Sequence, residues 1–238
     1  MDAPIHSCGT SVVGTVDRVT TVGRCGADNA WVGFRNLLYV ALLMAAAWQA
    51  WGQWRLRDMH PPDGQIAPLE PMQNNLDEAV NLQHGRWRLV ERASYDITAR
   101  ILHREDYRFD PLSDLIPEDL ALGWGPMSDN RVLAHFEISQ GGRFYSWQSL
   151  GALSVPRQVA VTHSANTHVI PGDTEVRREL AALRAGEVVH LIGSLVDGER
   201  DDGLRIRTSM TRNDEGAGAC EVMLVDTVEV LPPEVSTQ

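Results

Sequence analysis

Lysine is absent from this chain of 238 residues, and all twenty-one of its basic residues are arginine. Lysine codons are rich in A and T, so the absence indicates a GC-rich genome and says nothing about mechanism. From Asp58 onward, sixteen arginines stand against twenty-nine aspartates and glutamates, which gives a net charge of −13. An acidic surface of this kind repels phosphate backbones. The composition therefore argues against sequence-independent nucleic-acid binding, and no nucleic-acid partner is expected.

Cysteine is scarce as well. Only Cys220 lies after residue 58, so no internal disulfide framework can support that part of the chain. Cys220 opens the apolar run Val222 to Val225, and free cysteines are among the most buried residue types, so we expect a buried structural thiol. The chain also lacks a G-x-S-x-G nucleophile elbow, a Walker phosphate loop and a dinucleotide fingerprint. We therefore predict no catalytic set and no cofactor.

One long apolar segment stands out from this background. Residues 36–54 carry no charge; Arg35 precedes them, and Arg55 and Arg57 follow. A helix of this length spans roughly 28 Å, close to the hydrocarbon thickness of a bilayer. Three tryptophans gather at one end of the segment, and indole rings favour the headgroup boundary. We predict a transmembrane helix over residues 34–54, whose partner is the lipid bilayer.

Two other interpretations of this segment are open. A buried helix of a soluble protein can carry an apolar run, although such runs are usually shorter. Residues 45–47 are three alanines, which a signal peptidase could read, but the apolar run continues past that point to Trp51. We favour an uncleaved signal anchor that crosses a bacterial inner membrane once. The flanking arginines are nearly balanced, and a short N-terminal flank favours a periplasmic C-terminal domain.

The rest of the chain divides into four parts. Residues 1–33 contain five glycines, two cysteines and no periodic apolar face. We expect either a disordered extension or a mis-called start, with translation beginning at Val32. Residues 55–76 are rich in proline and predict an extended linker. Residues 77–231 form the soluble domain, and residues 232–238 form a tail.

Alternation of apolar and polar residues predicts a β-rich domain. The candidate strands are residues 87–103, 120–124, 135–139, 143–147, 187–196, 203–209 and 221–230. Gly141-Gly142 between two of these runs predicts a hairpin. Residues 173–185 predict a helix, with Asp173 or Thr174 as its N-cap and Gly186 at its end. We expect an α+β fold, a curved antiparallel sheet or small OB-like barrel with one or two helices, behind the transmembrane helix.

His163 and His168 are the only candidate metal ligands, and they lie in the densest polar segment of the chain. Two imidazoles five residues apart could hold a metal if the segment bends, with Asn166 orienting one of them. No HExxH or CxxC partner accompanies them. We favour a loop whose side chains satisfy neighbouring backbone groups, and we expect neither a metal nor a catalytic residue there.

Trp124 lies between Gly123 and Gly125. A tryptophan between glycines is typical of a packing anchor, with the glycines supplying the turn geometry. The alternative is an apolar groove for a peptide or a sugar. We favour the packing anchor.

Four runs of the sequence together resemble a family of small proteobacterial membrane-anchored proteins of unknown function. They are ILHREDYRFD (residues 101–110), LALGWGPMSD (120–129), HSANTHVIP (163–171) and GAGACEV (216–222). The likeness covers roughly residues 37–230. It implies a location and domain boundaries, and it implies no activity and no site residues.

Two functions are predicted from these features. The favoured one is a membrane-anchored, non-enzymatic interaction or accessory domain with a possible protein partner, because a tether and a β-rich domain need only surfaces. The alternative is a membrane-tethered hydrolase or metal-dependent enzyme that uses His163, His168 and Cys220. Clustering of these three side chains in one open cleft would favour the enzyme, whereas burial or dispersion would favour the interaction domain.

Overall fold

The structure is a computed structural model that describes residues 27–55, 59–212 and 219–233. Most of the extension predicted over residues 1–33 and most of the predicted tail lie outside the described residues. The chain forms two compact units, which divide after Ala50.

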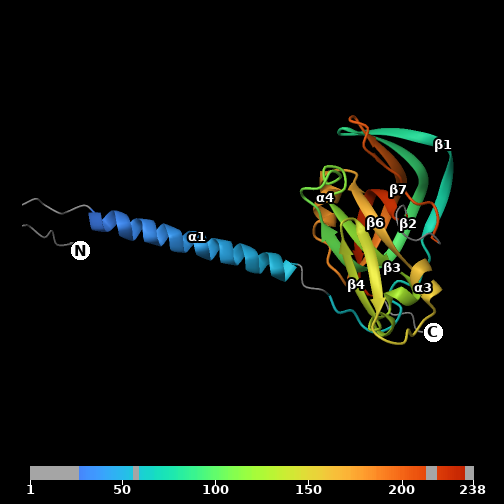
Figure 1. Ribbon diagram of the computed structural model, residues 1–238, viewed down its shortest axis with the longest axis horizontal. Helices are drawn as coiled ribbons and strands as arrows, with labels where there is room; N and C mark the ends of the chain where they lie inside the picture. The colour runs from blue at the N-terminus through green and yellow to red at the C-terminus, as the bar shows by residue number, and fades with distance from the viewer. Residues whose placement is uncertain (1–26, 56–58, 213–218, 234–238) are drawn as a thin grey trace, which may run out of the picture. The chain divides into compact units, whose positions relative to one another are not determined.

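The described residues of the first unit all lie in helix α1 (Ala27–Arg55) (Figure 1). Large apolar side chains are exposed along this helix: Leu37 is 70% exposed and Trp48 is 82% exposed. Among the described residues, no helix has both the length and the apolar character that crossing a membrane requires. The predicted helix is therefore present, and the predicted transmembrane span is not found in the described part of the chain.

The second unit is rich in β-structure (Figure 1). Its strands are β1 (Met72–His84), β2 (Trp87–Asp106), β3 (Glu118–Gly123), β4 (Phe136–Gly141), β5 (Phe144–Ser149), β6 (Ser164–Pro171), β7 (Val188–Arg200), β8 (Arg205–Ile206) and β9 (Glu221–Leu231). Its helices are short: η1 (Gly125–Ser128), α2 (Asn130–Leu133), α3 (Arg157–Thr162) and α4 (Thr174–Leu180). The prediction of a β-rich α+β fold is confirmed.

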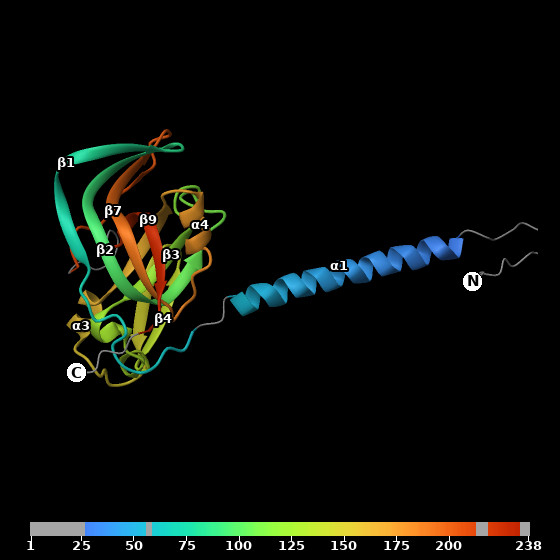
Figure 2. The same cartoon turned by 180° about the vertical axis from the view of Figure 1, so that it is seen from behind.

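Five strands close into a ring. They pair in the order β2-β3-β6-β9-β7, and β7 pairs again with β2. Figure 2 shows β2, β7 and β9 side by side. Strands β6 and β9 run parallel, so the sheet is mixed, and the prediction of an antiparallel sheet is wrong in this respect. Alternation cannot reveal this pairing because it reports which face of a strand is buried and not which strand lies beside it.

The long strand β2 supplies two cores. Tyr95, Ile97 and Ile101 are buried in the main cluster, at the alternate positions that the sequence predicts. A register shift between Glu91 and Ala93 interrupts the pairing with β7. Residues before the shift, such as Leu89, are buried in a second cluster. A bulge of this kind bends a strand, which lets one strand follow the curved wall.

Helix α4 closes part of the main core. The Asp173 carboxylate accepts hydrogen bonds from the backbone N–H groups of Glu175 and Val176, so the predicted N-cap is confirmed. Val176 and Leu180 face the core and are buried. The helix ends earlier than predicted, at Leu180.

The segment predicted as a linker, residues 55–76, belongs largely to the domain. Ala67 is fully buried and Ile66 nearly so. Their backbone N–H groups both donate to the Ser128 hydroxyl at 3.2 Å. Strand β1 already begins at Met72, so the boundary predicted at residue 77 falls inside a strand. The segment bends at several positions before β1, and its buried apolar residues hold it against the domain.

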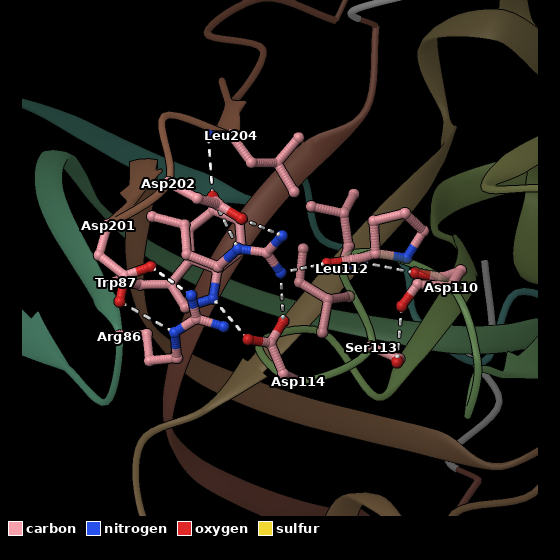
Figure 3. Close-up of polar contacts among 12 residues, drawn as sticks. Arg86, Trp87, Asp110, Leu112, Ser113, Asp114, Asp201, Asp202 and Leu204 are labelled. Carbon is pink, nitrogen blue, oxygen red and sulfur yellow. Dashed lines mark hydrogen bonds and ion pairs between the residues drawn. The ribbon is translucent and has the colours of Figure 1, made fainter.

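A polar network joins the start of β2 to the turn after β7 (Figure 3). The Arg200 guanidinium lies 5.4 Å from the centre of the Trp87 ring and donates to the Pro111 carbonyl at 2.7 Å. The Trp87 indole N–H donates to the Asp114 carboxylate at 3.2 Å. Arg200 also pairs with Asp202 at 2.8 Å. These contacts fix the loop after β2 against the β7–β8 turn.

Candidate functional site

The candidate site is a pocket of about 430 Å³ in the second unit. Five parts of the chain line it: Trp124, strand β5, helix α3, the start of β6, and the residues that flank positions 213–218. Its volume lies within the range of small-molecule sites, which are commonly lined by aromatic side chains and a few polar groups.

The β4–β5 hairpin supplies the aromatic wall of the pocket, which consists of Phe144, Tyr145 and Trp147. The hairpin predicted at Gly141-Gly142 is confirmed. The Trp147 ring packs edge-on against Phe136, with 5.1 Å between ring centres. The Tyr145 hydroxyl donates to the Ser164 hydroxyl at 3.1 Å. These contacts hold the wall in place before any ligand enters.

Trp124 is fully buried, which confirms the predicted packing anchor, and it also borders the pocket. Its indole N–H donates to the Glu70 carboxylate at 3.1 Å. Gly125 follows with φ +50°, and a Cβ there would lie 2.8 Å from the His163 ring. The glycine is therefore required both by its backbone conformation and by the close approach of this ring.

The structure does not bring His163 and His168 together. His163 follows α3; its Nδ1 lies 3.0 Å from the Val159 carbonyl and its Nε2 lies 3.1 Å from the Glu70 carboxylate. His168 is a buried residue of β6, with its Nδ1 2.8 Å from the Asp119 carboxylate. Across the described ranges, no cluster of three or more His, Cys, Asp or Glu side chains could hold a metal ion. The metal site therefore gains no support from the geometry.

Asp119 is a functional candidate that the sequence analysis missed. It is fully buried in β3, and its Oδ1 contacts both the His168 ring, at 2.8 Å, and the Arg143 guanidinium, at 3.0 Å. Two adjacent carboxylates, Glu118 and Asp119, at the start of an apolar strand were the signal that could have identified it. Burial alone would lower the pKa of His168, but hydrogen bonds with Asp119 and Cys220, together with their negative charges, outweigh it and raise that pKa to about 9.

Cys220 is only half-buried and borders the pocket, so the expectation of a buried structural thiol is wrong. The apolar run that suggested burial becomes β9 only from Glu221, and Cys220 lies just outside the strand. Its sulfur accepts a hydrogen bond from the Asn166 side-chain amide at 3.5 Å. Its other polar neighbour is His168.

Comparison with known proteins adds no name to this site. No family model, curated protein or solved structure matches the chain. The resemblance drawn from the four sequence runs stays a prediction, and the function is argued from the pocket and its polar groups.

We expect the domain to lose stability as the pH rises from about 5 to about 9. Burial raises the pKa of Glu118 from 4.5 to about 7, although the Arg104 guanidinium opposes this shift. The pKa of His168 rises from 6.5 to about 9. A group whose pKa is raised in the folded state stabilises it below the unfolded pKa, and this stabilisation is lost as the pH passes the folded value. Deprotonation of Glu118 and deprotonation of His168 should therefore both lower the stability of the fold as the pH rises.

Thermal unfolding followed by circular dichroism across this pH range would test the expectation. His168→Gln serves as the control, since it should flatten the decline above about pH 7 and leave the decline below it. A melting temperature that increases steadily over the same interval would contradict the assignment of both groups.

Proposed function

We propose that this protein is a membrane-attached interaction domain that binds a small ligand or a partner's side chain in the pocket beside β5 and β6. The observation that carries the proposal is the pocket itself, whose aromatic wall is fixed by contacts within the domain. Trp147 packs on Phe136 and Tyr145 binds Ser164, so little order has to be gained on binding.

The pocket combines apolar and polar groups in a way that suits an amphipathic ligand. Phe144, Tyr145 and Trp147 offer ring surface, and Asn166 and Arg212 offer polar N–H groups. Aromatic surface supplies affinity, whereas a few fixed polar groups orient a ligand.

The ring of strands supports a more specific assignment of the fold. We propose that it is an OB-type barrel, that is, a five-stranded Greek-key barrel. The closed pairing of five strands and the position of α4 between β6 and β7 both support this. Barrels of this type bind ligands on their strands and adjoining loops, and the pocket lies on such a surface.

We propose that α1 attaches the domain to a bacterial inner membrane, with the second unit in the periplasm. The support is the row of large apolar side chains exposed along the helix, including Leu37, Leu43 and Trp48, because water disfavours such a surface. Carbonate washing of membranes that carry the full chain is the test, and complete extraction of the protein would overturn the attachment.

The binding proposal predicts that Phe144→Ala weakens ligand binding. Phe144 borders the pocket and is 56% exposed, so its removal should affect binding more than folding. With anilinonaphthalene sulfonate as the probe, loss of one aromatic contact of about 1 kcal/mol should raise the dissociation constant about fivefold. Fluorescence titration of the purified chain measures this.

Phe109→Ala is the matched control. Phe109 is 99% exposed and does not border the pocket, so its replacement should leave the titration unchanged. Equal effects of the two substitutions, or no saturable binding by the native chain, would count against the proposed function.

The enzyme alternative keeps one specific observation in its favour. His163 lies apart, but His168 hydrogen bonds to Cys220, and Cys220 borders the pocket. Of the three side chains named for an enzyme, two are thus brought together.

A further inference from the structure

Cys220 lies where the pocket meets the polar interior of the domain. It borders the pocket, and its sulfur accepts a hydrogen bond from the Asn166 amide. Asn166 is itself buried and fixed: its carbonyl oxygen accepts from Gln140 at 2.6 Å, and its amide also reaches the Arg143 carbonyl at 3.3 Å. The Asn166 amide is therefore held next to the Cys220 sulfur at the edge of the pocket.

His168 lies behind the thiol and is held in one orientation. Its Nδ1 binds the Asp119 carboxylate, which leaves the other ring nitrogen for the hydrogen bond with Cys220. Asp119 has no contact with solvent, and the Arg143 guanidinium binds the same Asp119 oxygen, Oδ1, that His168 binds.

This order of groups matches the requirement for an activated nucleophile. A thiol needs an adjacent imidazole to manage its proton, and the imidazole needs a third group to orient it. Here the three groups come from separate parts of the chain. Asp119 belongs to β3, His168 belongs to β6, and Cys220 is the residue before β9. A purely structural thiol would need neither an oriented imidazole nor a pocket in front of it.

We propose that Cys220 is an acyl-accepting nucleophile that takes the acyl group of an activated ester or thioester bound in the pocket. The inference rests on the proposed function, because the same aromatic wall must hold the acyl group. Tyr145 and Trp147 provide the apolar surface that such a group would contact.

The step is balanced by the groups at hand. The Cys220 thiol gives its proton to His168, the sulfur attacks the carbonyl carbon, and a carbon–sulfur bond forms. The Asn166 N–H that donated to the sulfur now donates to the developing oxyanion. The bond to the leaving oxygen or sulfur then breaks, and the proton held by His168 passes to the leaving group. The products are an acylated Cys220 and a free alcohol or thiol, and no oxidant or reductant is consumed.

The test uses the full chain and p-nitrophenyl acetate as the probe. We expect release of one nitrophenolate per chain and an acetyl group that peptide mass spectrometry places on Cys220. Cys220→Ser should abolish both signals. Asn166→Ala and His168→Gln should each slow the release about a hundredfold, since each removes one contribution to the transition state.

Because His168 is buried, its replacement could unfold the domain, so a second measurement uses the native protein alone. The acetylation rate of native Cys220 should exceed the rate of the same cysteine in urea-unfolded chain at neutral pH. Acetylation no faster than in the unfolded chain, or an Asn166→Ala rate equal to the native rate, would overturn the inference. Intact binding of anilinonaphthalene sulfonate in that case would leave the proposed function standing. Loss of both acetylation and probe binding would overturn both the nucleophile and the proposed function.

Discussion

Trp124→Ala should destabilise the second unit by about 3–5 kcal/mol, the range found for removal of a buried tryptophan. The ring is fully buried among the main core residues, and its N–H binds Glu70. Truncation would leave a cavity between the core and the segment that contains Glu70. Because this wall is shared with the pocket, the variant should also lose binding of the fluorescent probe. Urea unfolding followed by circular dichroism measures the stability.

Trp124→Phe is the matched control. It keeps most of the apolar volume and loses the indole hydrogen bond, whose net contribution is about 1 kcal/mol. We therefore expect it to retain most of the stability that the alanine variant loses. If both variants were close to the native protein in stability, the tryptophan would not be the packing anchor that its burial indicates.

Arg143→Ala should cost about 3–5 kcal/mol, because it removes the arginine partner of a buried carboxylate. The guanidinium makes three hydrogen bonds to the Asp110 carboxylate, at 2.8, 2.9 and 3.1 Å, and one to Asp119 at 3.0 Å. It also lies over the Tyr107 ring, 3.7 Å from its centre. Asp119 has no exposure to water that could replace this partner. Urea unfolding again gives the measurement.

Arg143 also has a positive φ of 72°, so two further variants separate the backbone from the charge. Arg143→Gly should be less destabilised than the alanine variant by about 1 kcal/mol, since glycine adopts this conformation without strain. Arg143→Lys keeps the charge but cannot reproduce the forked contacts, so we expect an intermediate loss. Equal stability of the alanine and native proteins would show that the ion pairs contribute nothing.

Local structure was predictable where a short stretch carries its own signal. The alternation in β2, the Gly141-Gly142 hairpin and the Asp173 cap each follow from neighbouring residues. The closed ring was not predictable in detail, because β6 and β9 are far apart in sequence and alternation does not name a partner. The linker predicted before β1 was wrong for a related reason. A proline-rich composition predicts an irregular chain, but it does not show which part of the protein the chain packs against.

The candidate site was also predictable only in part. The chemistry of His163, His168 and Cys220 identified them as candidates in the sequence, but the residues that each one contacts depend on the fold. His163 lies at the junction of helix α3 and strand β6, whereas His168 lies within β6, and the two bind different carboxylates, Glu70 and Asp119. Asp119 escaped notice because nothing near it in the sequence reveals that β6 will lie alongside it.

The closed ring has a consequence for synthesis of the protein. Strand β9 pairs with both β6 and β7, and among the described strands it is the last to leave the ribosome. Until it emerges, β6 and β7 each keep an unpaired edge, and unpaired edges readily join other chains. Completion of the ring thus waits for β9, and a nascent chain that stops before Glu221 would carry two such edges.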